Sequence, residues 1–314
     1  MKRYTLPVAL LWCGLVLIGP ARICVAELPD PPPPRSRQEI EGVLAKARKL
    51  RPTGALKQLS VLLVADKKDH GPGEHDYPLW QKRWEVLLST EKTGQANLHG
   101  PPQPDTTADT GAGTVVVRTA QTWPDVEQFA WADVVVVFCY INWDKRKLAQ
   151  LQKHQEGGGG FVLIHSATWT KPRPSREVAE LTGSGGFTKY RHGPLKLRIV
   201  DATHPICLGL PAEIEFIDEP YWPMTPRMEL DTFRTLAVSD ERLDKKSSQT
   251  SPQPMFWTYE REDGRVFGCI PGHYNWTFDD PYLRLLLLRG MAWSAKQWPY
   301  RLDGLAMVGV AMKE

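Results

Sequence analysis

Cysteine is scarce in this chain, and the placement of its few cysteines argues against a disulfide-stapled scaffold. Five cysteines occur in 314 residues, and two of them fall within the first 26. The other three are widely spaced and odd in number, which favours buried thiols and leaves open one disulfide bond. None has the electropositive, partly exposed surroundings that a nucleophilic thiol requires. These three are Cys139, Cys207 and Cys269.

Net charge is also lacking once the first residues are set aside. The chain has 39 basic and 36 acidic residues, and the excess of three belongs to Lys2, Arg3 and Arg22. Because the rest is neutral and contains no basic run, there is no electrostatic reason to expect nucleic acid or anionic lipid as a partner.

The first 26 residues resemble a secretory signal peptide. Lys2 and Arg3 provide the positive start, residues 6–19 the apolar middle, and Cys-Val-Ala at 24–26 a small-residue cleavage site. The apolar stretch is too short for a comfortable membrane span. We therefore expect no integral membrane span, cleavage near Ala26, and a periplasmic or secreted mature protein.

The rest of the chain divides into three parts by composition. Residues 27–56 contain a proline-rich run at 29–34, which is typical of an extended linker, and a short charged helix at about 36–50. Residues 57–298 are long enough for a single domain with one core sheet. Residues 299–314 form a tail without an interpretable pattern.

Hydrophobic periodicity predicts an α/β fold. Short apolar runs at 59–65, 114–118, 133–139 and 161–164 are typical of buried strands, with helices expected at 79–88 and 144–155 between them. Strands separated by helices imply a mostly parallel sheet with helices on both faces. The second half is richer in strands, expected at 195–200, 233–238, 255–259 and 265–270, before a closing helix at 281–295. Polar segments at 90–113 and 239–253 are expected to be loops.

Candidate site residues follow the predicted strands. His165 comes directly after the apolar run 161–164, and His273 comes just after the run ending at Ile270. Ligands of open α/β sheets bind at the carboxyl ends of strands. Both histidines, together with Glu219, therefore become candidates for an acid/base site or for ligands of a divalent metal. The alternative for His165 is a hydrogen bond to the backbone at the end of a strand.

Other polar and aromatic residues in these loops are expected to line a substrate pocket. They are His70, His75, Asp76, Tyr77, His192, Tyr221, Trp222 and Trp276. No His-x-His or His-Glu-x-x-His pair occurs, so only folding can assemble a metal site. His99 and His154 are expected at the surface, and His204 in a turn where its ring caps the local backbone.

Five motifs in order resemble the ThuA-like (trehalose utilisation) family, and the resemblance covers residues 59–295. They are His-Asp-Tyr-Pro at 75–78, the glycine-rich strand and histidine at 158–165, His-Pro-Ile with Gly-Leu at 204–210, Asp-Glu-Pro-Tyr at 218–221, and Gly-Arg-Val-Phe with Gly-His at 264–273. The resemblance implies a flavodoxin-like fold similar to class I glutamine amidotransferases. In that comparison His165 stands at the position of the cysteine nucleophile, His273 at the catalytic histidine and Asn275 at the glutamate.

The sequence also departs from the amidotransferase and ThuA-like patterns at several positions, and the resemblance implies a class of function. Without the thiol and the carboxylate, the nucleophile–base arrangement for glutamine hydrolysis is absent. Leu163 replaces a usual glycine, and Pro220 a usual leucine. The family implies a role in disaccharide or 3-keto-glycoside catabolism with a small carbohydrate as partner. We expect either a hydrolase, lyase or isomerase with a His/Glu site and a possible divalent metal, or a non-catalytic sugar-binding or scaffold protein. The oligomeric state is left open.

Overall fold

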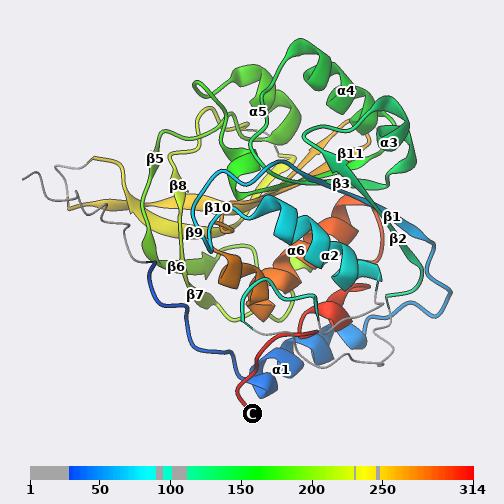
Figure 1. Cartoon of the computed structure of the whole chain (residues 1–314), viewed down its shortest axis with the longest axis vertical. Coiled ribbons are helices and arrows are strands. Elements are labelled where there is room, and N and C mark those ends of the chain that lie inside the picture. The colour runs from blue at the N-terminus through cyan, green and yellow to red at the C-terminus, as the bar shows by residue number, and fades with distance from the viewer. Residues whose placement is uncertain (1–27, 90–94, 101–111, 230, 245–247) are drawn as a thin grey trace, which may run out of the picture.

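A nine-stranded sheet runs through the protein, in the order β2-β1-β3-β4-β11-β10-β9-β6-β7 (Figure 1). The computed structural model describes residues 28–89, 95–100, 112–229, 231–244 and 248–314, so the expected signal peptide and most of the loop 90–113 lie outside it. The strands of the sheet are β1 (Leu59–Ala65), β2 (Val115–Gln121), β3 (Val134–Phe138), β4 (Gly160–Ile164), β6 (Gly193–Ile199), β7 (Glu213–Asp218), β9 (Phe233–Arg242), β10 (Thr250–Arg261) and β11 (Gly264–Cys269).

The two halves of the sheet differ in strand direction. The neighbouring pairs β1–β2, β1–β3, β3–β4 and β4–β11 are parallel, and the pairs from β11 outward to β7 are antiparallel. Strands β1 and β3 are buried along their whole length, because helices cover the parallel half on both sides. In β6 the apolar and charged residues alternate, as expected for a strand with one solvated face.

Helices lie on both faces of the sheet. Figure 1 shows α2 and α6 on one side and α3, α4 and α5 on the other. The helices are α1 (Arg37–Arg48), α2 (Tyr77–Ser89), α3 (Val126–Trp131), α4 (Lys145–Glu156), α5 (Arg176–Thr182) and α6 (Pro281–Ser294). Short 3-10 turns are η2 (His165–Thr168), η3 (Pro205–Cys207), η4 (Asn275–Asp279) and η5 (Asp303–Leu305). The predicted α/β class with helices on both faces is confirmed; the sheet is mixed, with its parallel strands gathered from β2 to β11.

Segments at both ends of the described chain pack on the same core. Ile40 and Leu44 of α1 and Leu302 of the C-terminal segment are buried in the main hydrophobic cluster. Arg289 of α6 is fully buried and forms a bidentate ion pair with Asp303, with N–O distances of 2.9 and 2.7 Å. Two parallel hydrogen bonds of this kind fix the tail in one orientation.

Two local predictions are wrong. The segment 239–253 is a loop only in its middle, because β9 continues to Arg242 and β10 begins at Thr250; positions 245–247 lie outside the described residues. His154 is buried rather than exposed, and its Nε2 lies 3.1 Å from the carbonyl oxygen of Gly160. Gly159 makes room for this ring, since a Cβ at that position would stand 2.2 Å from His154 Cε1. His204 caps its turn as expected, with Nδ1 accepting from the Ile206 N–H at 3.3 Å.

Candidate metal centre

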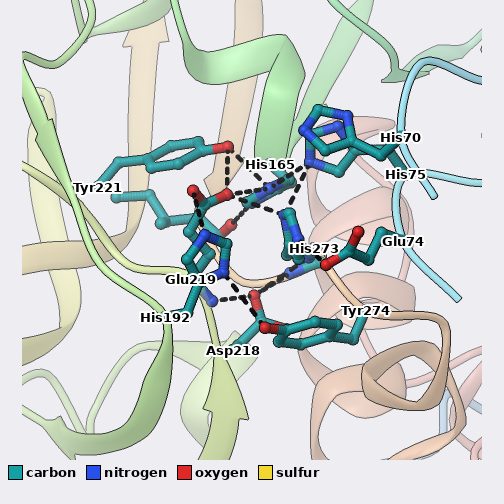
Figure 2. A network of polar contacts seen from close by, with 12 residues as sticks. His70, Glu74, His75, His165, His192, Asp218, Glu219, Tyr221, His273 and Tyr274 are labelled. Carbon is teal, nitrogen blue, oxygen red and sulfur yellow. Dashed lines mark hydrogen bonds and ion pairs between the residues drawn. The ribbon is translucent and has the colours of Figure 1, made fainter. Parts of the chain in front are cut away.

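Four polar side chains converge at one edge of the sheet. His75 follows β1, His165 follows β4 and His273 follows β11, three parallel strands whose carboxyl ends share that edge. Glu219 follows β7. This strand runs in the same direction as β11, because the four pairings between neighbouring strands from β11 to β7 are all antiparallel and an even number of reversals restores the direction. Figure 2 shows the four side chains pointing toward one another.

The backbone at the site is held in unusual conformations. His165 and His75 both have positive φ angles, 48° and 38°, which residues other than glycine rarely adopt. Gly272 has φ 142°, and a Cβ there would lie 3.1 Å from His165 Cβ. Position 272 must therefore be glycine, because a side chain there would keep the loop that carries His273 away from His165.

Asp218 connects the far edge of the sheet to the site. One carboxylate oxygen accepts the N–H groups of Glu219, Gly272 and His273, at 2.7, 3.0 and 3.1 Å. The other oxygen accepts the hydroxyl of Thr277 at 2.5 Å. The loop after β7 is thereby tied to the loop after β11, which brings Glu219 beside His273.

The four functional atoms form a closed ring of short contacts. His165 Nε2 lies 2.9 Å from His75 Nε2, and His75 Nε2 lies 3.0 Å from His273 Nδ1. Glu219 Oε2 lies 2.9 Å from His273 Nδ1 and 3.2 Å from His165 Nε2. All four atoms lie within 4.8 Å of one another, and the four residues are buried.

The opposite nitrogen of each ring shows where the ring protons are. His165 Nδ1 donates to the carbonyl oxygen of Ile270 at 2.7 Å, and His75 Nδ1 donates to the carboxylate of Asp69 at 3.1 Å. These oxygens only accept hydrogen bonds, so the proton of each neutral ring is on Nδ1. In these tautomers, the Nε2 lone pairs of His165 and His75 face each other across 2.9 Å.

His273 follows the same rule with its nitrogens exchanged. Its Nε2 donates to Glu74 Oε1 at 3.1 Å, which leaves Nδ1 directed into the ring of contacts. Metal-ligating histidines usually donate their other N–H to a carboxylate or backbone carbonyl, and all three rings do so here.

The spacing of the four atoms suits a first-row divalent ion. With bonds of about 2.0–2.1 Å, neighbouring ligands stand about 3.3–3.4 Å apart around a tetrahedral ion and about 2.8–3.0 Å apart around an octahedral one. The observed contacts of 2.9–3.2 Å fall between these limits. Three imidazoles and one carboxylate favour a metal such as zinc over calcium or magnesium, which prefer oxygen ligands.

The electrostatics of the site also favour bound positive charge. Burial lowers the pKa of His75 to about 3, so this ring is neutral and keeps a free lone pair. Burial opposes ionisation of Glu219, but its close contacts with the rings of His165 and His273 hold the pKa of its carboxyl group well below the usual range. Burial also disfavours protonation of His273, yet the Glu219 carboxylate raises the net pKa of that ring. A cation is thus attracted to the space beside His273 and Glu219.

Partly exposed side chains surround the buried cluster. The ring of His70 lies 3.8 Å from that of His75, and the ring of His192 lies 4.8 Å from that of His273. His192 Nε2 is 3.5 Å from Glu219 Oε1, and its Nδ1 lies 3.2 Å from the hydroxyl oxygen of Tyr274. The side chain of His192 is 45% exposed, so solvent reaches the cluster beside it.

Residues 90–294, about two thirds of the chain, match the ThuA family, which is described as trehalose utilisation. The chain belongs to the ThuA family. A ThuA-like protein from Bacteroides uniformis aligns with a TM-score of 0.56 and 18% identity over 79% of this chain and 95% of that one. Another, from Parabacteroides merdae, has a TM-score of 0.49 and 19% identity over 76% and 90% of the two chains. No curated protein matches this chain.

ThuA membership supports a carbohydrate-related role, and the low-identity structural match shows the shared fold alone. Within the described part of this ThuA protein, no helix is both long enough and apolar enough to cross a membrane. All three cysteines outside the first 26 residues are buried and unpaired. Burial raises the pKa of Cys139 and of Cys207 to about 12, far from the range of a nucleophilic thiol.

Some residues predicted to line the pocket of the ThuA domain lie elsewhere. The indole N–H groups of Trp222 and Trp276 are buried and donate to the carbonyl oxygens of Arg242 and Ile217. Asp76 pairs with Lys68 at 3.1 Å and caps the first turn of α2. None of these three side chains reaches the cluster.

Other predicted residues do reach it. Tyr221 lies with its hydroxyl 2.7 Å from His165 Nε2 and 3.0 Å from Glu219 Oε2. Tyr77 supports His75, with its hydroxyl 2.9 Å from Nδ1. Asp69 and Glu74, which orient two of the rings, were not singled out from the sequence, although both belong to the polar loop after β1.

Proposed function

We propose that this ThuA protein is an exported, metal-dependent enzyme that acts on a disaccharide or a 3-keto-glycoside. The observation that carries the proposal is the contact between His165 Nε2 and His75 Nε2, two lone pairs 2.9 Å apart in a buried setting. Without a cation, such an arrangement is repulsive. The ligands are His75, His165, His273 and Glu219, and the signal peptide at 1–26 accounts for export.

A divalent ion bound there supplies a Lewis acid that polarises a carbonyl or hydroxyl oxygen of the substrate. The surrounding residues hold and move protons. We assign the proton of His192 to Nε2, the tautomer in which Nδ1 accepts from the Tyr274 hydroxyl 3.2 Å away, so that Nε2 serves as a donor. Glu219 Oε1 lies outside the ring of close contacts and is free to accept a proton.

These two groups suit elimination from a 3-keto-glycoside. The ketone at C3 acidifies the C2–H bond, and the C2 proton passes to Glu219 Oε1. The electrons of that bond form a C1–C2 double bond, the C1–O bond breaks, and the leaving oxygen takes up the proton now held by Glu219 Oε1, which restores the carboxylate. His192 Nε2, 3.5 Å from Glu219 Oε1, donates a hydrogen bond to the sugar during these transfers. Isomerisation shares the first of these proton transfers.

A second function is a non-catalytic sugar-binding role. The observation that favours it is the burial of the four ligand residues, which are at most 5% exposed and leave little room for substrate at the ion. In that case the metal would only hold the four loops together.

The experiment combines metal analysis with turnover. Purified protein is expected to contain about one equivalent of a first-row divalent ion, and 3-keto-trehalose is expected to be consumed at a rate that chelation abolishes and the same ion restores. Consumption that continues without metal would contradict the enzyme proposal. A stoichiometric metal with no turnover of glycosides or their 3-keto derivatives would favour the sugar-binding role.

A further inference from the structure

Among the tyrosine, tryptophan and phenylalanine residues that the structure describes, Tyr190 alone has an exposed side chain, with an exposed fraction of 59%. It belongs to β5 (Lys189–Tyr190), which pairs with β8 (Tyr221–Trp222) in a small two-stranded sheet. An exposed aromatic ring on its own is unremarkable on a protein surface. Its position relative to the cluster is what distinguishes Tyr190.

Tyr190 stands on the same side of this small sheet as the metal-centre residues. It pairs directly with Tyr221, and directly opposed residues of neighbouring strands place their side chains on one face. The hydroxyl of Tyr221 contacts His165 Nε2, so this face looks toward the ligands. Lys189 and Trp222 occupy the opposite face.

Two further rings frame Tyr190 at nearly right angles. Its centroid lies 6.0 Å from that of Trp169, with 77° between the planes, and 6.0 Å from that of His192, with 83° between the planes. Trp169 in turn packs against Tyr221 at 4.8 Å. The rings of Tyr190 and Trp169 therefore form an aromatic corner beside His192, the exposed neighbour of Glu219.

Such a corner suits the ring of a sugar. Aromatic side chains provide flat apolar surface, and pyranose rings present C–H groups on their faces while their hydroxyl groups stay in water. Among the described residues, no hydrogen-bond partner holds the Tyr190 hydroxyl, so the fold does not require this side chain for a polar contact.

We propose that Tyr190 and Trp169 form a stacking subsite for a second sugar ring, adjacent to the one that meets the metal centre. This inference rests on the proposed function and narrows its substrate class to glycosides with two rings. A monosaccharide glycoside fills only the inner position. Removing the Tyr190 side chain should then lower the affinity only for the two-ring substrate.

The test measures binding of two probes to metal-loaded protein by calorimetry. The probes are 3-keto-trehalose, which has two rings, and methyl 3-keto-α-glucoside, which has one. For Tyr190→Ala we expect the affinity for the two-ring probe to fall about 3- to 10-fold, the range expected for one aromatic contact, and that for the one-ring probe to change less than about 2-fold. Tyr190→Phe keeps the ring and should bind both probes like the wild type.

The outcomes separate the subsite from the proposed function. If the wild type binds both probes but Tyr190→Ala affects neither, or both equally, the subsite is refuted and the proposed function stands. If the metal-loaded wild type binds neither probe, the proposed function fails and the subsite fails with it. A loss of metal from Tyr190→Ala would also refute the subsite, because the residue would then act through the metal centre.

Discussion

Replacing His165 by asparagine should abolish metal binding while leaving the fold nearly intact. Asparagine tolerates the left-handed backbone at this position, φ 48°, better than alanine does. The fold loses one hydrogen bond, from Nδ1 to Ile270, worth about 1 kcal/mol. For a protein of this length, that is a decrease of about 2 °C in melting temperature.

The effect on metal binding is much larger. Removing only a hydrogen-bond partner of a ligand weakens metal affinity about 10- to 100-fold, so removal of a ligand should exceed 100-fold. At a free metal concentration of 100 times the dissociation constant, the ion adds about 2.7 kcal/mol of stability to the wild type. After a 100-fold loss of affinity, the same concentration adds only about 0.4 kcal/mol.

The assay is thermal melting with and without the metal, together with metal analysis. The wild type should gain about 5 °C, and His165→Asn less than about 1 °C. The matched control is His204→Asn, which changes a buried histidine outside the cluster and should keep the full metal-dependent gain. If His165→Asn also keeps it, His165 is not a ligand and its role is structural.

Three further predictions follow from the same geometry. Glu74→Gln, which weakens the orientation of one histidine ligand, should reduce metal affinity about 10- to 100-fold without abolishing it, as measured by competition with a chelator. Burial lowers the pKa of His204 to about 4 from 6.5, so only the unfolded chain takes up this proton between those values and stability falls on acidification. In chelator, His204→Asn should therefore lose less unfolding free energy than the wild type between pH 6.5 and 4, by up to roughly 3 kcal/mol. Glutaminase activity should be absent, and serine in place of all three buried cysteines should leave metal content and turnover unchanged; loss of either from a folded variant would overturn this. These cysteines are Cys139, Cys207 and Cys269.

The parallel half of the fold was predictable because its strands are buried on both faces. Continuous apolar runs such as Leu59–Ala65 identify such strands, and the polar residues after them mark the edge that holds the cluster. His165 and His273 could be assigned to this edge from their positions after β4 and β11. Glu219 was grouped with them from the sequence as well, but the way it reaches them was not predictable, since it depends on the hydrogen bonds that tie the loop after β7 to the loop after β11 through Asp218.

The two wrong local predictions have a common cause: polar residues occur there in a paired strand or at a buried position. The β9–β10 hairpin includes Asp240 and Ser251, whose polarity is typical of a loop, although both belong to paired strands. His154 lies in a helix rich in charge, and only the empty space at Gly159 allows its ring to be buried. Neither the pairing nor the space is visible in local composition.

The four proposed metal ligands come from distant segments, so an ion can be bound by all four only late in folding. His75 and His165 are separated by 90 positions, and His75 and His273 by 198. No fragment that ends before residue 273 has all four ligands, and closing such long loops is slow. A coloured substitute ion such as cobalt would therefore report when the last stage of folding is complete. Its absorption should appear only after the helical signal has formed.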